Sequence, residues 1–71
     1  MTTEILAPLP GKIIRVNIEP NAHVVEDLEV LVIEAMKMET PIYAPCDGVI
    51  EKMFKKEGDE VEEDDLIAII A

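Results

Sequence analysis

The sequence is poor in aromatic residues, cysteine and positive charge. It contains one Phe, one Tyr, no Trp and a single cysteine, Cys46, among 71 residues. One cysteine cannot form an internal disulfide, which excludes a small secreted scaffold held together by disulfides. Six basic residues stand against sixteen acidic ones, for a net charge of −10. The chain therefore lacks the basic surface that nucleic acids and anionic membranes require.

Long apolar runs are also absent. No stretch approaches the ~18 apolar residues of a membrane span, and the first residues lack the basic and apolar segments of a signal peptide. No group of His, Cys, Asp and Glu has metal-site spacing, and no glycine-rich phosphate loop occurs. We therefore expect a cytoplasmic protein without membrane insertion, nucleic-acid partner or metal.

The apolar residues that are present favour β-structure. Ile and Val together account for 17 of the 71 residues, and their branched side chains suit a pleated sheet. No window has the apolar periodicity and caps of a helix. Turn signals rich in Pro, Gly, Asn and Asp instead separate short segments, at 8–11, 19–21, 45–48 and 57–59. This pattern predicts an all-β sandwich or barrel.

The second half of the chain repeats the first at a distance of 37 positions. Ala7-Pro8-x-x-Gly11-x-Ile13 falls on Ala44-Pro45-x-x-Gly48-x-Ile50. The similarity has no gaps and extends over residues 7–34 and 44–71. Neither copy could bury its apolar face alone, so we expect one domain, residues 1–71, in which two copies of one unit pack about a pseudo-two-fold axis.

Each copy contains Gly-x-Ile-x-x-apolar, a spacing that breaks the two-residue period of a strand. A β-bulge after Ile13 and after Ile50 would restore the inward facing of the next apolar residue. The alternative is that Ile14 and Ile18 face inward and Ile13 faces outward.

The segment between the two copies predicts a hairpin with its turn at Met36 and Lys37. A two-fold axis would place this turn and the two termini at opposite ends of the body. Tight hairpin turns favour Asn-Gly or Asp-Gly, because both central residues have positive φ, and Met36-Lys37 breaks this rule. Two large apolar side chains beside a lysine at an exposed tip indicate a surface that another protein contacts.

Residues 34–40, Glu-Ala-Met-Lys-Met-Glu-Thr, resemble the Ala-Met-Lys-Met signature of biotin carboxyl carrier domains in the biotinyl/lipoyl attachment family. The repeat and the Ala-Pro-x-x-Gly openings extend the resemblance over the chain. It implies a flattened β-barrel or sandwich of two four-stranded antiparallel sheets with pseudo-two-fold symmetry. It also implies covalent biotin on the ε-nitrogen of Lys37, within an attachment and recognition motif formed by Glu34, Ala35, Met36 and Met38.

The resemblance also implies a function. Biotin on Lys37 would be carboxylated at a biotin carboxylase, or by a decarboxylating donor, and would deliver the carboxyl group to a carboxyltransferase. The chain would be a non-catalytic, monomeric carrier with a swinging arm. Its partners would be a biotin protein ligase, a biotin carboxylase and a carboxyltransferase or decarboxylase subunit. Family members often have glycine in place of Asp27 and Asp64, and aspartate tolerates the left-handed backbone.

Two other functions remain open at this point. A lipoyl carrier of a 2-oxo-acid dehydrogenase or glycine-cleavage system would use the same fold, although lipoyl members favour Asp-Lys-Ala around the lysine. An unmodified barrel would serve as an adaptor, with Lys37 an ordinary surface lysine. The acidic run 57–65 predicts a solvated edge that resists self-association, or a docking surface for a basic partner.

Overall fold

The computed structural model describes residues 2–71, so Met1 of the expected 1–71 domain lies outside the described residues. This part of the chain contains no helix, and hence no helix that could cross a membrane. It forms the strands β1 (Thr3–Leu6), β2 (Gly11–Val16), β3 (His23–Val24), β4 (Glu29–Ala35), β5 (Met38–Tyr43), β6 (Gly48–Met53), β7 (Glu60–Val61) and β8 (Leu66–Ile70).

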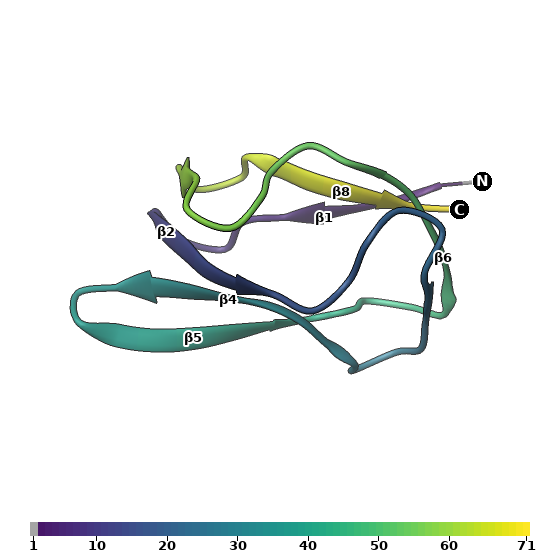
Figure 1. Ribbon diagram of the computed structural model, residues 1–71, viewed down its shortest axis with the longest axis horizontal. Helices are drawn as coiled ribbons and strands as arrows, with labels where there is room; N and C mark the ends of the chain where they lie inside the picture. Colours follow the sequence, from purple (N-terminus) through teal and green to yellow (C-terminus); the bar gives the residue numbers. More distant parts are fainter. Residues whose placement is uncertain (1) are drawn as a thin grey trace.

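The strands form two four-stranded antiparallel sheets, as the resemblance implies, within the all-β class that the sequence pattern predicts. One sheet has the order β1-β8-β6-β3 and the other the order β5-β4-β2-β7. The two sheets face each other across the body, which measures 33 × 18 × 16 Å (Figure 1). The all-β class is therefore confirmed.

The internal repeat of the sequence is also a repeat of the structure. A shift of 37 residues converts β1–β4 into β5–β8 and turns the strand order of one sheet into that of the other. Loop hydrogen bonds repeat as well. The N–H of Gly58 donates to the carbonyl of Ile13 at 2.7 Å, and the N–H of Asn21 donates to the carbonyl of Ile50 at 2.7 Å. Such correspondence relates the two halves by a pseudo-two-fold axis.

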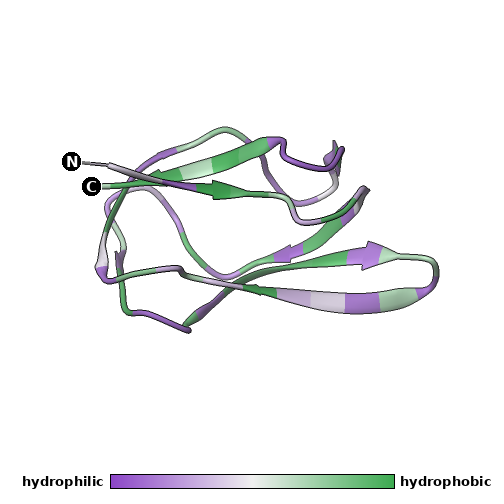
Figure 2. Ribbon diagram, turned by 180° about the vertical axis from the view of Figure 1, so that it is seen from behind, coloured by the Kyte–Doolittle hydropathy of each residue, from purple (hydrophilic) through white to green (hydrophobic). Residues whose placement is uncertain are grey.

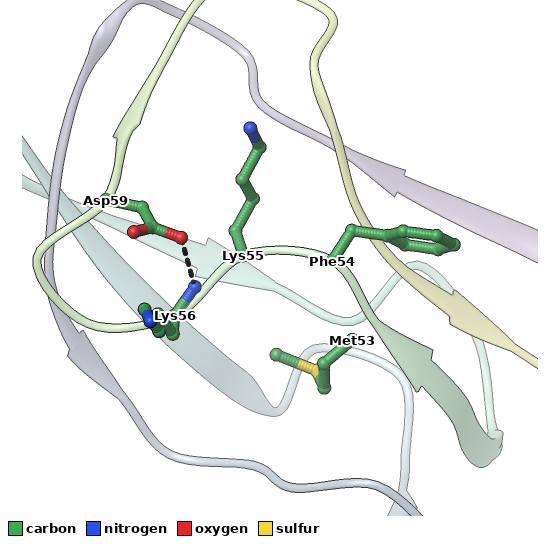
Figure 3. Close-up of a pocket in the computed structure, with 5 residues that line it drawn as sticks. All are labelled: Met53, Phe54, Lys55, Lys56 and Asp59. Atoms are coloured by element: carbon green, nitrogen blue, oxygen red, sulfur yellow. Dashed lines mark hydrogen bonds between the residues drawn. The ribbon is translucent and has the colours of Figure 1, made fainter.

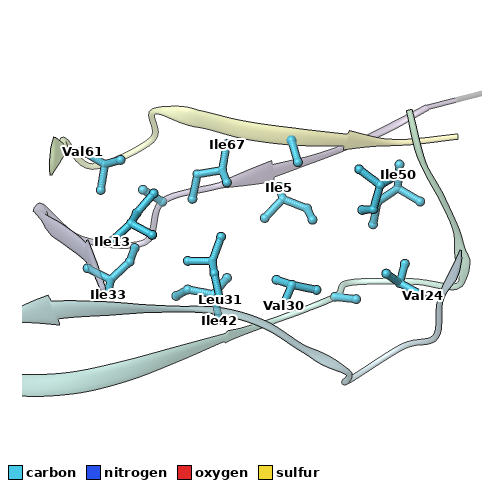
Figure 4. Close-up of a cluster of buried hydrophobic side chains, with 14 residues drawn as sticks. Ile5, Ile13, Val24, Val30, Leu31, Ile33, Ile42, Ile50, Val61 and Ile67 are labelled. Carbon is cyan, nitrogen blue, oxygen red and sulfur yellow. The ribbon is translucent and has the colours of Figure 1, made fainter. Parts of the chain in front are cut away.

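A purely aliphatic core lies between the sheets (Figure 4). Among the described residues no polar or charged side chain is buried. Figure 2 shows the hydrophobic residues concentrated along the strands. The core cluster consists of Ile5, Ala7, Ile13, Val24, Val30, Leu31, Ile33, Ile42, Ala44, Ile50, Val61, Ile67, Ala68 and Ile70.

Both predicted β-bulges are present. The strand register shifts between Ile13 and Arg15 on β2, and between Ile50 and Lys52 on β6. Ile13 and Ile50 are fully buried, whereas Ile14, the extra residue of the first bulge, is only half-buried. The alternative in which Ile13 faces outward is therefore wrong, because the bulge lets the strand keep its apolar face toward the core.

The turn residues adopt the backbone that their sequence positions require. Asn21 and its repeat equivalent Gly58 have φ values of 73° and 94°. Asp27 and Asp64, where family members often have glycine, have φ values of 71° and 70°. Asn and Asp enter this left-handed region more easily than most residues, so the fold tolerates them here.

Candidate functional site

A two-residue turn at Met36 and Lys37 connects β4 to β5. The strands pair from Glu29 opposite Tyr43 up to Ala35 opposite Met38. The φ angles of Met36 and Lys37 are 53° and 65°, so both central residues are left-handed, as in the tight turns that match the twist of a hairpin. The turn thus occurs where the sequence predicts it, without the Asn or Gly that would adopt it easily.

The β4–β5 hairpin is held in place by the burial of β4 and by a close contact between β4 and the neighbouring strand β2. Residues 30–33 of β4 are all buried. A Cβ atom on Gly11 of β2 would lie 2.5 Å from the carbonyl oxygen of Glu34 and 2.6 Å from Cγ2 of Ile33. Only glycine therefore allows β2 to approach β4 this closely. The base of the hairpin is thus packed closely against β2, and its tip lies at one end of the molecule.

The tip of the β4–β5 hairpin lies at one end of the long axis of the molecule. In Figure 1 the β4–β5 turn is at the left end, and the N- and C-termini are together at the right end. This is the arrangement that the repeat predicts. A group attached at the turn would point away from any segment joined to the termini.

All five residues of the expected attachment motif come together at this hairpin. Met36 is 94% exposed and Met38 is 70% exposed. Lys37 and Glu34 are also exposed, and Ala35 is half-buried. Large apolar side chains this exposed commonly mark a surface that another protein contacts. The amine therefore projects into solvent between two flexible apolar side chains.

The sheet face next to the turn is acidic. Glu34 lies directly opposite Glu39 on β5 and opposite Lys12 on β2, and Lys12 lies opposite Glu60 on β7. All four side chains are exposed. Like charges directly opposite each other weaken strand pairing, and Lys12 offsets only part of this repulsion. This row of charged residues across β5, β4, β2 and β7 therefore presents a negative electrostatic field, beside Lys37, to an approaching protein.

These residues fit a covalently attached cofactor better than one held in a cavity. The lysine is exposed at the tip of a turn, and the one hollow described below is lined by other residues. An exposed primary amine can form an amide with an activated carboxyl group. Within residues 2–71, no cluster of three potential metal ligands accompanies it.

Comparison with known proteins identifies the family. A family model described as "Biotin-requiring enzyme", which covers biotinyl and lipoyl domains, matches residues 3–70. The chain belongs to this biotinyl/lipoyl family. Pyruvate carboxylase of Rattus norvegicus, a mitochondrial protein, is 42% identical to this member over 64 residues, which make up 90% of the chain and 5% of the carboxylase.

Solved structures of carboxylases and of a lipoyl domain share the fold of this biotinyl/lipoyl domain. Urea carboxylase of Kluyveromyces lactis superimposes with a TM-score of 0.91 and 31% identity, over 100% of this chain and 6% of that one. The lipoyl domain of the 2-oxoglutarate dehydrogenase complex of Azotobacter vinelandii superimposes with a TM-score of 0.81 and 28% sequence identity, over 96% of this chain and 94% of that one. The domain thus spans about a twentieth of the carboxylases it resembles and nearly all of the lipoyl domain.

One feature of this biotinyl/lipoyl domain was missed from the sequence. A shallow hollow lies at the end of β6 and in the loop after it, lined by Met53, Phe54, Lys55, Lys56 and Asp59 (Figure 3). The signal that could have located it is the concentration of lysines at 52–56 in an acidic chain.

Proposed function

We propose that the chain is a biotin carboxyl carrier domain, residues 1–71, in which Lys37 is the attachment site. The observation that carries this proposal is the hairpin tip. An exposed lysine stands between two exposed methionines on a strained turn, at the opposite end from the termini, in a member of a biotin-requiring family. Likeness to pyruvate and urea carboxylases favours biotin as the group attached.

Attachment requires the Lys37 amine as a nucleophile. In the proposed step its nitrogen attacks the carbonyl carbon of biotin activated as an adenylate. The C–N bond of an amide forms, the bond to AMP breaks, and the amine loses a proton to a base supplied by the ligase. The product has no charge on the former amine. Met36 and Met38 give the ligase an apolar surface on either side of the reacting nitrogen.

The domain contributes position rather than chemistry. Once attached, biotin supplies the ureido ring that accepts and releases the carboxyl group. The rigid hairpin holds the arm clear of the body, and attachment to a larger assembly replaces bulk diffusion with an effective concentration on the order of millimolar. Active sites of a biotin carboxylase and of a carboxyltransferase or decarboxylase would be the partners. A cytoplasmic location and a monomeric state stay predictions.

Co-expression with a biotin protein ligase tests the proposal. We expect the purified chain to gain the mass of one biotinyl group and to bind streptavidin. Lys37→Arg keeps the charge but cannot form the same amide, so its capture should fall to background. Lys55→Arg is the matched control and should be captured like the wild type. Capture of the Lys37→Arg variant would refute the assigned site.

A lipoyl carrier is the second candidate, because the lipoyl domain of Azotobacter vinelandii shares the fold over nearly its full length. The methionines on both sides of Lys37 differ from the Asp-Lys-Ala pattern that lipoyl members favour. Incubation with biotin ligase or with lipoate ligase separates the two functions. Lipoate would add a different mass and two reducible sulfur atoms. Modification by lipoate ligase alone would replace the biotin proposal.

A further inference from the structure

Half of the basic residues of the chain lie within five consecutive positions. Lys52, Lys55 and Lys56 surround Phe54 at the end of β6 and in the loop that follows. We call Lys52, Phe54, Lys55 and Lys56 the basic-aromatic patch. Residues 52–56 carry three positive charges and no negative charge, on a chain whose net charge is −10, and they are flanked by the acidic residues Glu51 and Glu57.

The patch adjoins a hollow of about 410 Å³. Phe54 is 43% exposed, and Nζ of Lys52 lies 5.1 Å from the centre of its ring. In Figure 3 the side chains of Phe54, Lys55 and Lys56 point in different directions around the loop, with Met53 below. The residues that line the hollow therefore include an aromatic ring, a thioether and two lysines, together with Asp59, whose carboxylate accepts the N–H of Lys56. Aromatic and Met residues are enriched at the centres of protein interfaces.

The internal repeat shows that the fold does not require this patch. Shifting back by 37 residues places Phe54 on Asn17, while Lys55 and Lys56 fall on Ile18 and Glu19. The backbone is the same in both copies. Phe54 N–H donates to the Ile67 carbonyl at 2.8 Å, and Asn17 N–H donates to the Val30 carbonyl at 2.8 Å. Lys52 falls on Arg15, which is also basic, so the comparison applies to the other three positions. Because the first copy folds without an aromatic or basic residue at those positions, the fold does not require Phe54, Lys55 or Lys56.

The loop is held in place before any partner arrives. The N–H of Lys56 donates to Oδ2 of Asp59 at 2.9 Å, and the N–H of Asp59 donates back to the Lys56 carbonyl at 3.0 Å. Gly58 N–H binds the Ile13 carbonyl on β2 at 2.7 Å. A surface that is already ordered loses less conformational entropy when it binds.

The loop also leads toward the end of the molecule that carries Lys37. It continues into β7, where Glu60 lies opposite Lys12 of β2, and Lys12 lies opposite Glu34 near the turn. The loop that carries the patch therefore connects directly to β7, which borders the acidic face beside the attachment hairpin.

We propose that the basic-aromatic patch docks an acidic protein segment with an apolar anchor, on an enzyme that acts on the group carried by Lys37. The proposal rests on the carrier function proposed above. Ammonium groups of Lys52, Lys55 and Lys56 pair with the carboxylates of the segment, and the anchor contacts Met53 and Phe54 in the hollow. A short acidic segment can be confined to the three lysines of the patch. A nucleic acid or an anionic membrane would extend its negative charge over the acidic remainder of the chain, whose net charge is −10, and would be repelled there.

The test is a titration of the ¹⁵N-labelled, biotinylated chain with a short synthetic peptide of alternating glutamate and leucine at low salt. We expect amide shifts confined to residues 52–59, and weaker binding at high salt because ions screen the charges. The variant Phe54→Asn with Lys56→Glu carries the repeat-equivalent residues. It should bind at least about fivefold more weakly. Lys12→Glu makes the same change in net charge elsewhere and should change binding by less than about twofold.

Three results would overturn the docking surface. These are equal binding by the double variant, shifts spread over Lys12, Arg15 and Lys37 as well, or tighter binding of duplex DNA or anionic vesicles than of the peptide. If the double variant does not fold, Lys55→Ala supplies the comparison. Streptavidin capture of each sample is measured separately. A wild-type chain that binds the peptide but takes no biotin would refute the carrier function and the link to Lys37, while supporting the acidic-peptide site.

Discussion

The left-handed turn at the hairpin tip should cost the protein stability, and Met36→Asn tests this directly. Met36 has a φ of 53°, a conformation that costs a residue with a Cβ atom about 1–2 kcal/mol. Asn adopts it more easily and is favoured at the first central position of such turns. Because the Met36 side chain is 94% exposed, its removal sacrifices almost no buried apolar surface.

We therefore expect Met36→Asn to raise the free energy of unfolding by about 0.5–1 kcal/mol. For a domain of this size, the midpoint of thermal unfolding should rise by about 2–8 °C. Urea titration followed by circular dichroism gives the free energy, and a thermal scan gives the midpoint. Met36→Ala is the matched control, since alanine removes the same side chain without easing the backbone and should leave stability within about 0.5 kcal/mol of the wild type.

Both Met36 variants should also become poorer substrates for the biotin ligase. Loss of the exposed thioether removes apolar contact beside the reacting amine, so kcat/KM for attachment should fall for both Met36→Asn and Met36→Ala. A Met36→Asn chain that is less stable than the wild type would refute the argument from backbone strain. Unchanged ligation by both variants would refute the recognition role of Met36.

Four further substitutions test the fold. Ile13→Ala and its repeat equivalent Ile50→Ala should each lower the free energy of unfolding by about 2–5 kcal/mol in urea titrations, because both side chains are fully buried; a loss below about 1 kcal/mol at either site would contradict the packing. Gly11→Ala should cost about 1–3 kcal/mol, since its Cβ would overlap β4, and wild-type stability would disprove the close approach. Asp47→Ala removes a carboxylate that accepts the N–H of Glu26 at 2.7 Å and should cost about 0.5–1.5 kcal/mol, whereas an unchanged urea midpoint would show that this bond contributes nothing.

Much of the fold can be predicted from the sequence because the same structural unit occurs twice in the chain. The spacing of Gly and Ile in each copy predicts a bulge, and the register shifts after Ile13 and Ile50 confirm it. The alignment of Asn21 with Gly58 predicts a left-handed turn residue in both places, which the φ angles confirm. Because each pattern occurs at the same place in both copies, chance does not readily explain it, and it can be used to predict local structure.

The parts that could not be predicted depend on which strands lie side by side. The charge row through Glu34 exists only because β7, β2, β4 and β5 pair in a particular register. The hollow near Phe54 depends on a loop conformation fixed by contacts with β2 and β8. Neither arrangement follows from periodicity or from local spacing. The charge row combines residues that are distant in the sequence, and the hollow, although lined by residues 53–59, depends on hydrogen bonds to the distant residues Ile13 and Ile67.

Site-resolved mass spectrometry of the chain after co-expression with a biotin ligase tests the central claim most directly. The chain has five lysines, all in the described structure, and each of them could in principle form an amide. The account predicts a biotinyl group on the peptide that contains Lys37 and none on Lys12, Lys52, Lys55 or Lys56. Biotin on another lysine, or an unmodified Lys37 in a correctly folded chain, would contradict it.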